Sequence, residues 1–246
     1  MAVIRLNNEQ WTFIQEFLPE QHMGRPRSRD KECFEAILYV LKTGCQWELL
    51  PGEYPPKSTV HRRYLIWKKR VCSTVSSVKL AARSLGKGFF IWMPRFAWQR
   101  GGDKISKAGK FKASKIMALC NEHGQIQNFE IGKGGQSDHK AVSPILPFIP
   151  ENVYLTADRG FDSKKLRRKI RHRQARPLIP RRQFENKPRR RTPKPAIYKL
   201  RWIMEQAFSR TDQFRKLTVR VERNCQNYKQ YWYLGLAWIE LKKLMG

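Results

Sequence analysis

Two acidic side chains in this chain have the setting that metal-dependent chemistry requires. In the segment IYKLRWIMEQAF, Tyr198, Arg201 and Glu205 lie at positions i, i+3 and i+7. On a helix of 3.6 residues per turn, this spacing places a phenol, a guanidinium and a carboxylate along one stripe. Carboxylates are the usual ligands of hard divalent cations. The stripe therefore predicts a helix that presents Glu205 to a site.

A second carboxylate comes from the segment VYLTADRGFDS. It has the pattern of an apolar strand that runs into Asp158 and then turns at Gly160. A strand-end aspartate and a helical glutamate can share a metal, so we expect Asp158 and Glu205 to lie close together although they are 47 positions apart (205 minus 158). The alternative is that Asp158, with Arg159 and Asp162, forms only a helix-capping cluster.

The first part of the chain has a helical pattern. Residues 7–18 predict an amphipathic helix with Asn7 or Asn8 as its N-cap. A second helix is expected from Asp30, as its cap, to Gly44, and a third, basic helix begins with Ser58 as its cap. Two helices joined by a connection rich in Gly and Pro, of which the second is basic, indicate a helix-turn-helix-like DNA-binding region.

From about residue 88 the pattern changes to short apolar runs, typical of strands. The runs are GFFIWMPRFAW, SKIMALCN, QNFEIG and NVYLTAD, with a hairpin turn predicted at residues 123–125. A helical period returns in SKKLRRKIRHRQ, and PLIPRR predicts one more short strand. Strands and helices around a carboxylate site predict an α/β fold with helices on both faces of a mixed sheet. We expect residues 1–75 to form the helical region and residues 76–246 the core.

Charge points to a polyanionic partner. Fifty Lys and Arg against 20 Asp and Glu give a formal net charge of +30, and the pI is about 10.4. Such an excess favours nucleic acid, and no apolar run reaches the ~18 residues of a membrane span. No signal peptide is recognised at the N-terminus. Five widely spaced cysteines without a C-x2-C pair argue against a disulfide framework or a zinc site and favour a cytoplasmic, reduced protein.

Two basic segments are candidates for contact with DNA phosphates. The third helix and the Pro- and Arg-rich loop before the Tyr198 helix supply the cations. The alternatives are that the helix presents only a solvated charged face and that the loop is only a flexible linker. The DNA-binding candidates are Arg62, Arg63, Lys68 and Lys69 in the helix, and Arg181, Arg182, Arg189 and Arg190 in the loop.

The motif Y-x2-R-x3-E, placed after a strand that ends in ADRGFDS, resembles the catalytic core of DDE-type bacterial insertion-sequence transposases, in the group of insertion sequences four and five. The N-terminal segment ILYVLKTGCQWELLPGEYPPKSTVHRRYLIW resembles the helical DNA-binding region that precedes this core. The resemblance covers most of the chain.

The resemblance implies an RNase-H-like sheet in which two Asp and one Glu bind two divalent ions, Mg²⁺ or Mn²⁺, for strand cleavage and transfer. It implies that Asp158 and Glu205 are metal ligands and that Tyr198 and Arg201 lie near the scissile phosphate, where a planar guanidinium fits well. The partners that it implies are transposon terminal repeats, target DNA and further copies of the same chain, in association with the bacterial nucleoid.

The chain departs from the family pattern in two places. The first Asp of the family comes from an early core strand, but no aspartate occurs from residue 54 to residue 102, and Trp92 stands in the expected position. Asp103 is the nearest acid, and Asp212 replaces a Lys that follows the Glu. Indole cannot bind a hard metal. We therefore keep three hypotheses: an active transposase in which Asp103 substitutes, a catalytically dead DNA-binding remnant, and an RNA-binding basic protein.

Overall fold

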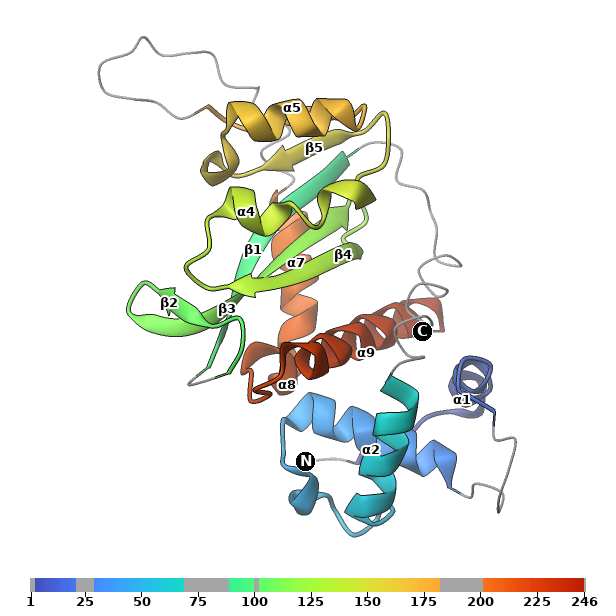
Figure 1. Cartoon of the computed structure of the whole chain (residues 1–246). Coiled ribbons are helices and arrows are strands. Elements are labelled where there is room, and N and C mark those ends of the chain that lie inside the picture. Colours follow the sequence, from blue (N-terminus) through green and yellow to red (C-terminus); the bar gives the residue numbers. More distant parts are fainter. Residues whose placement is uncertain (1–2, 21–28, 69–88, 100–101, 182–200, 246) are drawn as a thin grey trace. The chain divides into compact units, whose positions relative to one another are not determined.

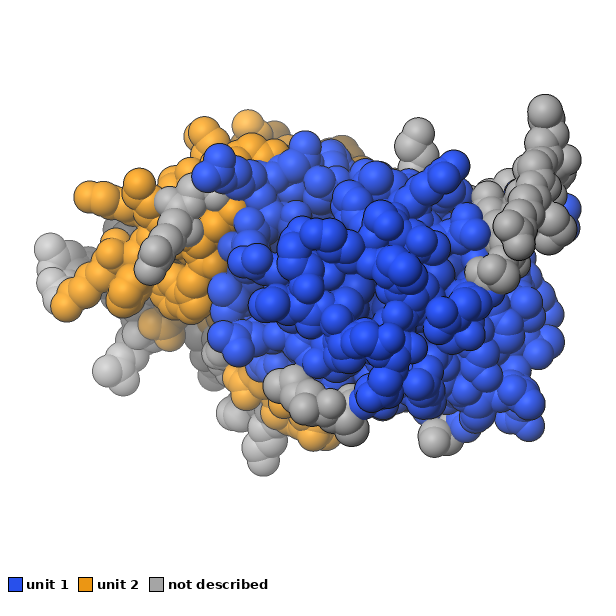
Figure 2. Space-filling view, turned by 90° about the horizontal axis from the view of Figure 1, so that it is seen from below, with its two compact units in different colours: residues 1–82, 211–246 blue, residues 83–210 orange. Residues whose placement is uncertain are grey.

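The computed structural model describes residues 3–20, 29–68, 89–99, 102–181 and 201–245. The chain forms two compact units, one of residues 1–82 with 211–246 and one of residues 83–210 (Figure 2). Figure 1 labels most of the helices and strands of both. The C-terminal residues 211–246 therefore group with the N-terminal helices, whereas the sequence led us to expect a single division near residue 75.

The second unit is built on a mixed sheet of six strands. Its order is β2-β3-β1-β5-β6, and β4 also pairs with β3. β1 is antiparallel to β3 and parallel to β5, which is in turn parallel to β6. The predicted mixed sheet is thus confirmed. The strands are β1 (Phe89–Trp98), β2 (Ser106–Ala108), β3 (Phe111–Asn121), β4 (Ile126–Lys133), β5 (Tyr154–Ala157) and β6 (Arg176–Leu178).

The predicted hairpin turn joins β3 and β4. The Asn121 side-chain oxygen accepts hydrogen bonds from the backbone N–H groups of His123 at 3.1 Å and Gln125 at 2.9 Å. Gly124 has a φ of 71°, a left-handed conformation that glycine adopts without strain. An asparagine before a glycine-containing turn is the local signal that made this hairpin predictable.

Helices cover both faces of the sheet. On one face, Trp92 and Met117 belong to an apolar cluster that includes Val142 of α4 (Asp138–Val142) and Leu166 of α5 (Lys164–His172). On the other face, Arg95 of β1 lies over the ring of Phe208 in α7 (Arg201–Asp212), 5.5 Å from its centroid. Figure 1 shows α4 and α5 in front of the strands and α7 behind them. This is the arrangement that the α/β pattern predicted.

The first unit is helical. It contains α1 (Asn8–Gln15), α2 (Asp30–Thr43), a helix over residues 57–68, α8 (Arg215–Thr218) and α9 (Cys225–Leu244). Tyr64 stacks on Tyr231 of α9 at 5.1 Å between ring centroids, and Glu35 of α2 accepts a hydrogen bond from the backbone N–H of Leu6 at 2.8 Å. These contacts join segments that are far apart in the sequence.

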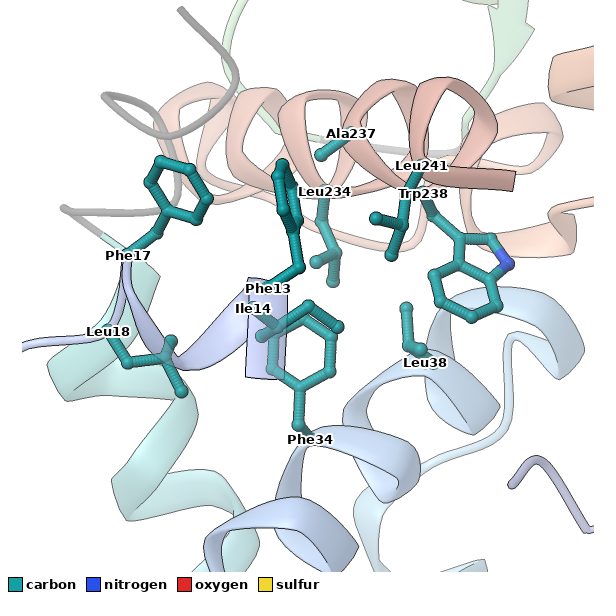
Figure 3. A pocket seen from close by; sticks show the side chains of 10 residues that line it. All are labelled: Phe13, Ile14, Phe17, Leu18, Phe34, Leu38, Leu234, Ala237, Trp238 and Leu241. Carbon is teal, nitrogen blue, oxygen red and sulfur yellow. The ribbon is translucent and has the colours of Figure 1, made fainter. Parts of the chain in front are cut away.

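Apolar side chains of α1, α2 and α9 also line a pocket in this unit (Figure 3). Ile14 from α1 and Phe34 from α2 contribute to it together with Leu234 from α9. The apolar residues of α1 and α2 recur at helical spacing, as their sequences predict.

Several details of the helices differ from the sequence-based expectation. Asn7 caps α1 as predicted, in a capping box with Gln10, and Gly44 ends α2 with a φ of 68°. However, Arg29 is the N-cap of α2 and Asp30 is its first residue. The third helix begins at residue 57, so Ser58 lies within it. The short elements β2 and α4 were not predicted, because runs of three to five residues carry too little periodicity.

Candidate active site

Asp158 lies at the carboxyl end of β5, the strand between β1 and β6. The preceding residue, Ala157, pairs with Trp92 of the parallel strand β1. Asp158 has an extended backbone and takes the N-cap position of η3 (Arg159–Phe161), but its side chain makes no capping hydrogen bond. Ligands of α/β proteins commonly bind outside the carboxyl ends of parallel strands. Asp158 thus occupies the cap position of the capping alternative without its side chain bonding to the first turn of η3.

The turn that follows Asp158 is held by a charged pair. Asp162 accepts hydrogen bonds from Nε of Arg167 at 3.0 Å and from Nη2 of the same side chain at 2.8 Å. Arg167 Nη2 also donates to the backbone carbonyl of Ile179 at 2.6 Å. Both side chains are largely buried, with 14% of Arg167 and 18% of Asp162 exposed. Asp162 is therefore a structural residue that fixes the turn between β5 and α5.

A second pair, which the sequence did not reveal, lies on the other side of the same turn. Lys115 Nζ donates to Asp138 Oδ1 at 2.8 Å and to the backbone carbonyl of Gln136 at 2.6 Å. A Cβ atom added to Gly160 would lie 2.8 Å from Asp138 Oδ2. The carboxylate thus packs against the glycine, and this close approach explains why residue 160 lacks a side chain. A lysine inside the buried strand SKIMALCN was the available signal for this pair.

Glu205 lies on the exposed side of α7. Its neighbours Met204 and Phe208 are buried, and Phe208 is the residue that Arg95 of β1 contacts. Arg210, further along α7, donates to the carbonyl of Gly124 at 3.4 Å. These contacts pack the helix that carries Glu205 against β1 and the hairpin.

Other predicted site residues fall partly outside the described structure. Tyr198 lies outside the described residues, as do Lys69, Arg182, Arg189 and Arg190. Arg201 is the first described residue of α7, and its side chain is not described. The predicted roles of these residues stay predictions.

The side chain of Trp92 lies on one face of the sheet, and we expect that of Asp158 on the opposite face. It is 1% exposed, its ring centroid is 6.2 Å from that of Phe161, and it belongs to the apolar cluster on the α4 and α5 face together with Ala157. Side chains alternate along a strand. Ile91 and Met93 therefore share the opposite face with Arg95. Met93 directly follows the Trp92–Ala157 pair, as Asp158 follows Ala157, so its position is better placed than that of Trp92 to supply an acid beside Asp158.

The acidic side chains do not complete a two-metal site in the described part of the chain. Among those residues, no group of three or more His, Cys, Asp and Glu could hold a metal ion. Asp158 and Glu205 are oxygen donors of the type that Mg²⁺ prefers, but β1 adds no acid to them. Asp103 is exposed in the turn between β1 and β2. Within the described residues, the three acids that the family pattern requires are therefore not found together.

The DNA-binding candidates differ in the exposure of their side chains and in their hydrogen-bond partners. Arg62 and Arg181 are exposed. Arg63 is 15% exposed and its Nε donates to Asp30 at 2.8 Å. Lys68 donates to the side chain of Asn227 at 3.4 Å. Arg63 and Lys68 therefore take part in the packing of the helical unit.

No helix among the residues that the structure describes has both the length and the apolar character needed to cross a membrane. The α2 helix and the helix over residues 57–68 are connected by residues 44–56, which include the short helix η1 (Trp47–Leu49). This connection is longer than the turn of three to four residues typical of a helix-turn-helix motif.

A curated relative and a solved structure resemble this chain. A protein of Burkholderia cepacia named "Putative transposase for insertion sequence element IS402" is 32% identical over 97 residues, which cover 38% of this chain and 42% of that protein. The piggyBac transposase, solved as a synaptic complex with hairpin DNA, superposes with a TM-score of 0.50 at 11% identity over 94% of this chain and 70% of that one. This similarity supports the predicted RNase-H-like fold.

Two family models match the sequence, and they meet near residue 70. Residues 6–74 match the family described as "Putative transposase of IS4/5 family", and residues 70–239 match the family described as "Transposase DDE domain". The second match covers most of the 246 residues. The chain therefore belongs to the DDE-domain transposase family, in agreement with the Y-x2-R-x3-E signature and the aspartate at the end of β5.

Proposed function

We propose that this chain acts in DNA transposition, by binding the ends of an insertion sequence and bringing them to a site marked by Asp158 and Glu205. One observation on β1 carries the proposal. Asp158 directly follows β5, which pairs with β1, and the helix α7, which bears Glu205, packs on β1 through the contact of Arg95 with Phe208. A carboxylate at the end of a strand and another on an adjacent helix are the setting for cleavage of a phosphodiester. Arg201 and Tyr198 would lie near the scissile phosphate.

The metal ions that the family implies are Mg²⁺ or Mn²⁺, and Asp158 with Glu205 would be their ligands. Since the described residues offer no third acid beside these two, the pair of ions would be held poorly. Strand cleavage by this chain should accordingly be weak or absent, while DNA binding, which depends on the cationic surface, should remain.

The proposed binding partner is duplex DNA. The net charge of +30 suits the phosphate backbone, and we propose that exposed Arg62 and Arg181 contribute to it, with Lys69, Arg182, Arg189 and Arg190. The N-terminal helices would form the DNA-reading region, with a connection of residues 44–56 that is longer than the turn of a helix-turn-helix motif. We further propose that active assemblies contain more than one copy of the chain and that the protein works in the bacterial cytoplasm, at the nucleoid.

The test is a cleavage assay on duplex DNA taken from both flanks of the chain's own coding sequence, with Mg²⁺ or Mn²⁺. Wild type should cut weakly or not at all. Met93→Asp would restore an acid on the Arg95 face and should gain cutting that Glu205→Gln, added to it, abolishes. Trp92→Asp should instead disturb folding, because it buries a carboxylate in the apolar cluster.

Asp103 decides between the active and inactive versions of this function. If wild type cuts DNA and Asp103→Ala abolishes cutting, then Asp103 swings in as the third ligand from its glycine-flanked turn. Cutting that survives in both Asp158→Asn and Glu205→Gln would contradict the proposed site altogether.

A second candidate function is a DNA-binding protein without turnover. The burial of Trp92 and the presence of Met93 beside it favour this version. Duplex binding without cutting by wild type would support it. An RNA-binding function is the remaining alternative, and competition between a duplex DNA and an RNA of the same length separates the two.

A further inference from the structure

The outer face of α5 carries an unusually dense set of cations. α5 spans Lys164–His172, and only Leu166 and Ile170 of its residues are buried. The helix contains no acidic residue. Its exposed basic residues, which we call the α5 cationic face, are Lys164, Lys165, Arg168, Lys169, Arg171 and His172.

These side chains surround Arg168. On a helix, residues three and four positions apart are neighbours, so Lys164, Lys165, Arg171 and His172 all lie next to Arg168. Within the described residues, no side chain of the α5 cationic face takes part in a hydrogen bond or an ion pair. The face thus concentrates positive charge on a helix that Figure 1 shows beside β5.

This arrangement disfavours the helix itself. Like charges at positions i and i+4 repel each other by a few tenths of a kcal/mol per pair. Lys164 and Lys165 also lie in the first turn, where the helix dipole disfavours cations. A solvated surface helix would relieve both costs with a few acidic residues. The sequence has none here, which indicates that the charges serve an anionic partner.

The neighbouring Arg167 shows what a structural arginine of the same helix does. It is 14% exposed and is bonded to Asp162 and to the carbonyl of Ile179. Arg168, one residue later, is exposed. Within one turn of the helix, Arg167 therefore serves packing, whereas Arg168 presents its charge to solvent.

We propose that the α5 cationic face binds the phosphate backbone of duplex DNA. A membrane surface fits less well, because none of the exposed large apolar side chains of the chain lies in α5, and interfacial helices need such anchors. The α5 helix begins directly after the turn that follows Asp158, so DNA bound here would run close to the proposed site. The choice of DNA over other polyanions rests on the proposed function.

The size of the helix limits how much of the backbone it can contact. Nine residues at 1.5 Å each span about 13 Å. A duplex carries one negative charge per ~1.7 Å of its axis, counting both strands. About two to four phosphates of one strand would therefore face the helix, without base-specific contacts, and the face would add affinity rather than sequence preference.

The test compares two triple variants of the full chain that remove the same charge. Lys164→Gln, Arg168→Gln and Arg171→Gln change the α5 cationic face and keep good helix formers. The control replaces Lys107, Lys110 and Lys112 by Gln in and around the β2–β3 turn, where the three side chains are also exposed. Binding to a duplex of about 30 base pairs is measured by anisotropy at several salt concentrations.

We expect the α5 triple variant to bind about tenfold or more weakly and to reduce the slope of log affinity against log salt by roughly two to three, since each phosphate contact adds ~0.9. The control variant should change affinity by less than about threefold. Arg168→Lys with Arg171→Lys should bind nearly as wild type, because the charge is kept. Unchanged unfolding midpoints would exclude loss of fold.

Equal effects of the two triple variants would overturn the inference, because binding would then depend on total charge alone. It would also be overturned if the α5 variant lost affinity for RNA or anionic vesicles and kept its affinity for duplex DNA. If wild type itself bound no duplex DNA, the proposed function would fail, which is a different result. Because the readout is binding, the outcome does not depend on whether the chain cuts DNA.

Discussion

Two basic helices of this chain use their charges differently. In the helix over residues 57–68, Arg63 is bonded to Asp30 and Lys68 to Asn227, so both cations help to pack the helical unit. In α5, Arg167 alone is engaged in this way, through Asp162. Six further basic residues of α5 are exposed. The density of Lys and Arg in a sequence therefore does not tell how many of them can reach a ligand.

The difference comes from the nearby acids. Asp30 begins α2, and folding brings it to within 2.8 Å of Arg63, 33 positions along the chain. The turn before α5 offers one acid, Asp162, and Arg167 occupies it. An acid that is brought close by folding turns a candidate DNA contact into a structural ion pair. The variants of Arg167 and Arg63 described below test this contrast most directly.

The largest effect should be that of salt on duplex binding by the whole chain. If the exposed cations of both basic helices contact six or more phosphates, affinity should fall about a thousandfold or more between 50 and 200 mM salt. Glu205→Gln should not change this response, because Glu205 contributes no positive charge. Binding isotherms at four salt concentrations measure it, and a flat response would contradict a phosphate-dominated interface.

The next effect concerns stability within α5. Arg167→Gln should lower the free energy of unfolding by about 2–4 kcal/mol, because it leaves the largely buried Asp162 carboxylate without its partner. Arg168→Gln should change it by less than about 0.5 kcal/mol, since the side chain is exposed. Urea denaturation followed by circular dichroism measures both. Similar losses in the two variants would show that the contrast within the helix does not hold.

A smaller contrast is expected in the helix over residues 57–68. Arg63→Gln should destabilise the protein by about 1–3 kcal/mol, because Asp30 loses a partly buried partner. Arg62→Gln should leave stability nearly unchanged and lower the salt slope of duplex binding by about one. Denaturation and anisotropy on the same two variants measure this. If only Arg63→Gln weakened binding, and did so without destabilising the protein, Arg63 rather than Arg62 would be the DNA contact.

The smallest effect should appear at a thiol. Burial raises the pKa of Cys33 to about 11, with a further contribution from Asp30 that Arg63 opposes. Because thiolate is the reactive form, Cys33 should resist alkylation at pH 8 while the part-exposed Cys45 reacts. Mass spectrometry after brief alkylation measures both sites.

The Cys33 thiol also links stability to pH. The pKa in the folded protein lies above the ordinary value of 9.0, so the stability that this thiol contributes is present below pH 9 and is lost as the pH rises through about 11. Cys33→Ala should remove that part of the pH dependence. Arg63→Gln removes a cation that lowers the Cys33 pKa, so with the packing around α2 intact it should slow alkylation of Cys33. Faster alkylation would show instead that the Arg63 pair holds this region closed.

Much of the architecture could be predicted from the sequence, because local signals are strong there. The strand of VYLTAD, the hairpin turn at Asn121 to Gln125 and the cap at Asn7 depend on side chains close to them in the chain. The Y-x2-R-x3-E spacing and the aspartate after β5 carried the resemblance that indicated the transposase family.

Tertiary structure alone decided which faces and partners these residues have. Trp92 and Met93 are adjacent in the sequence, but strand pairing with β5 places Trp92 in the apolar cluster with Ala157 and leaves Met93 for the other face. Lys115 and Asp138 meet across 23 positions beside Gly160. The grouping of residues 211–246 with the N-terminal helices is likewise a long-range result. The pattern of apolar residues in a segment indicates whether that segment is a helix or a strand, whereas the burial and the partners of each residue depend on the other elements that fold against the segment.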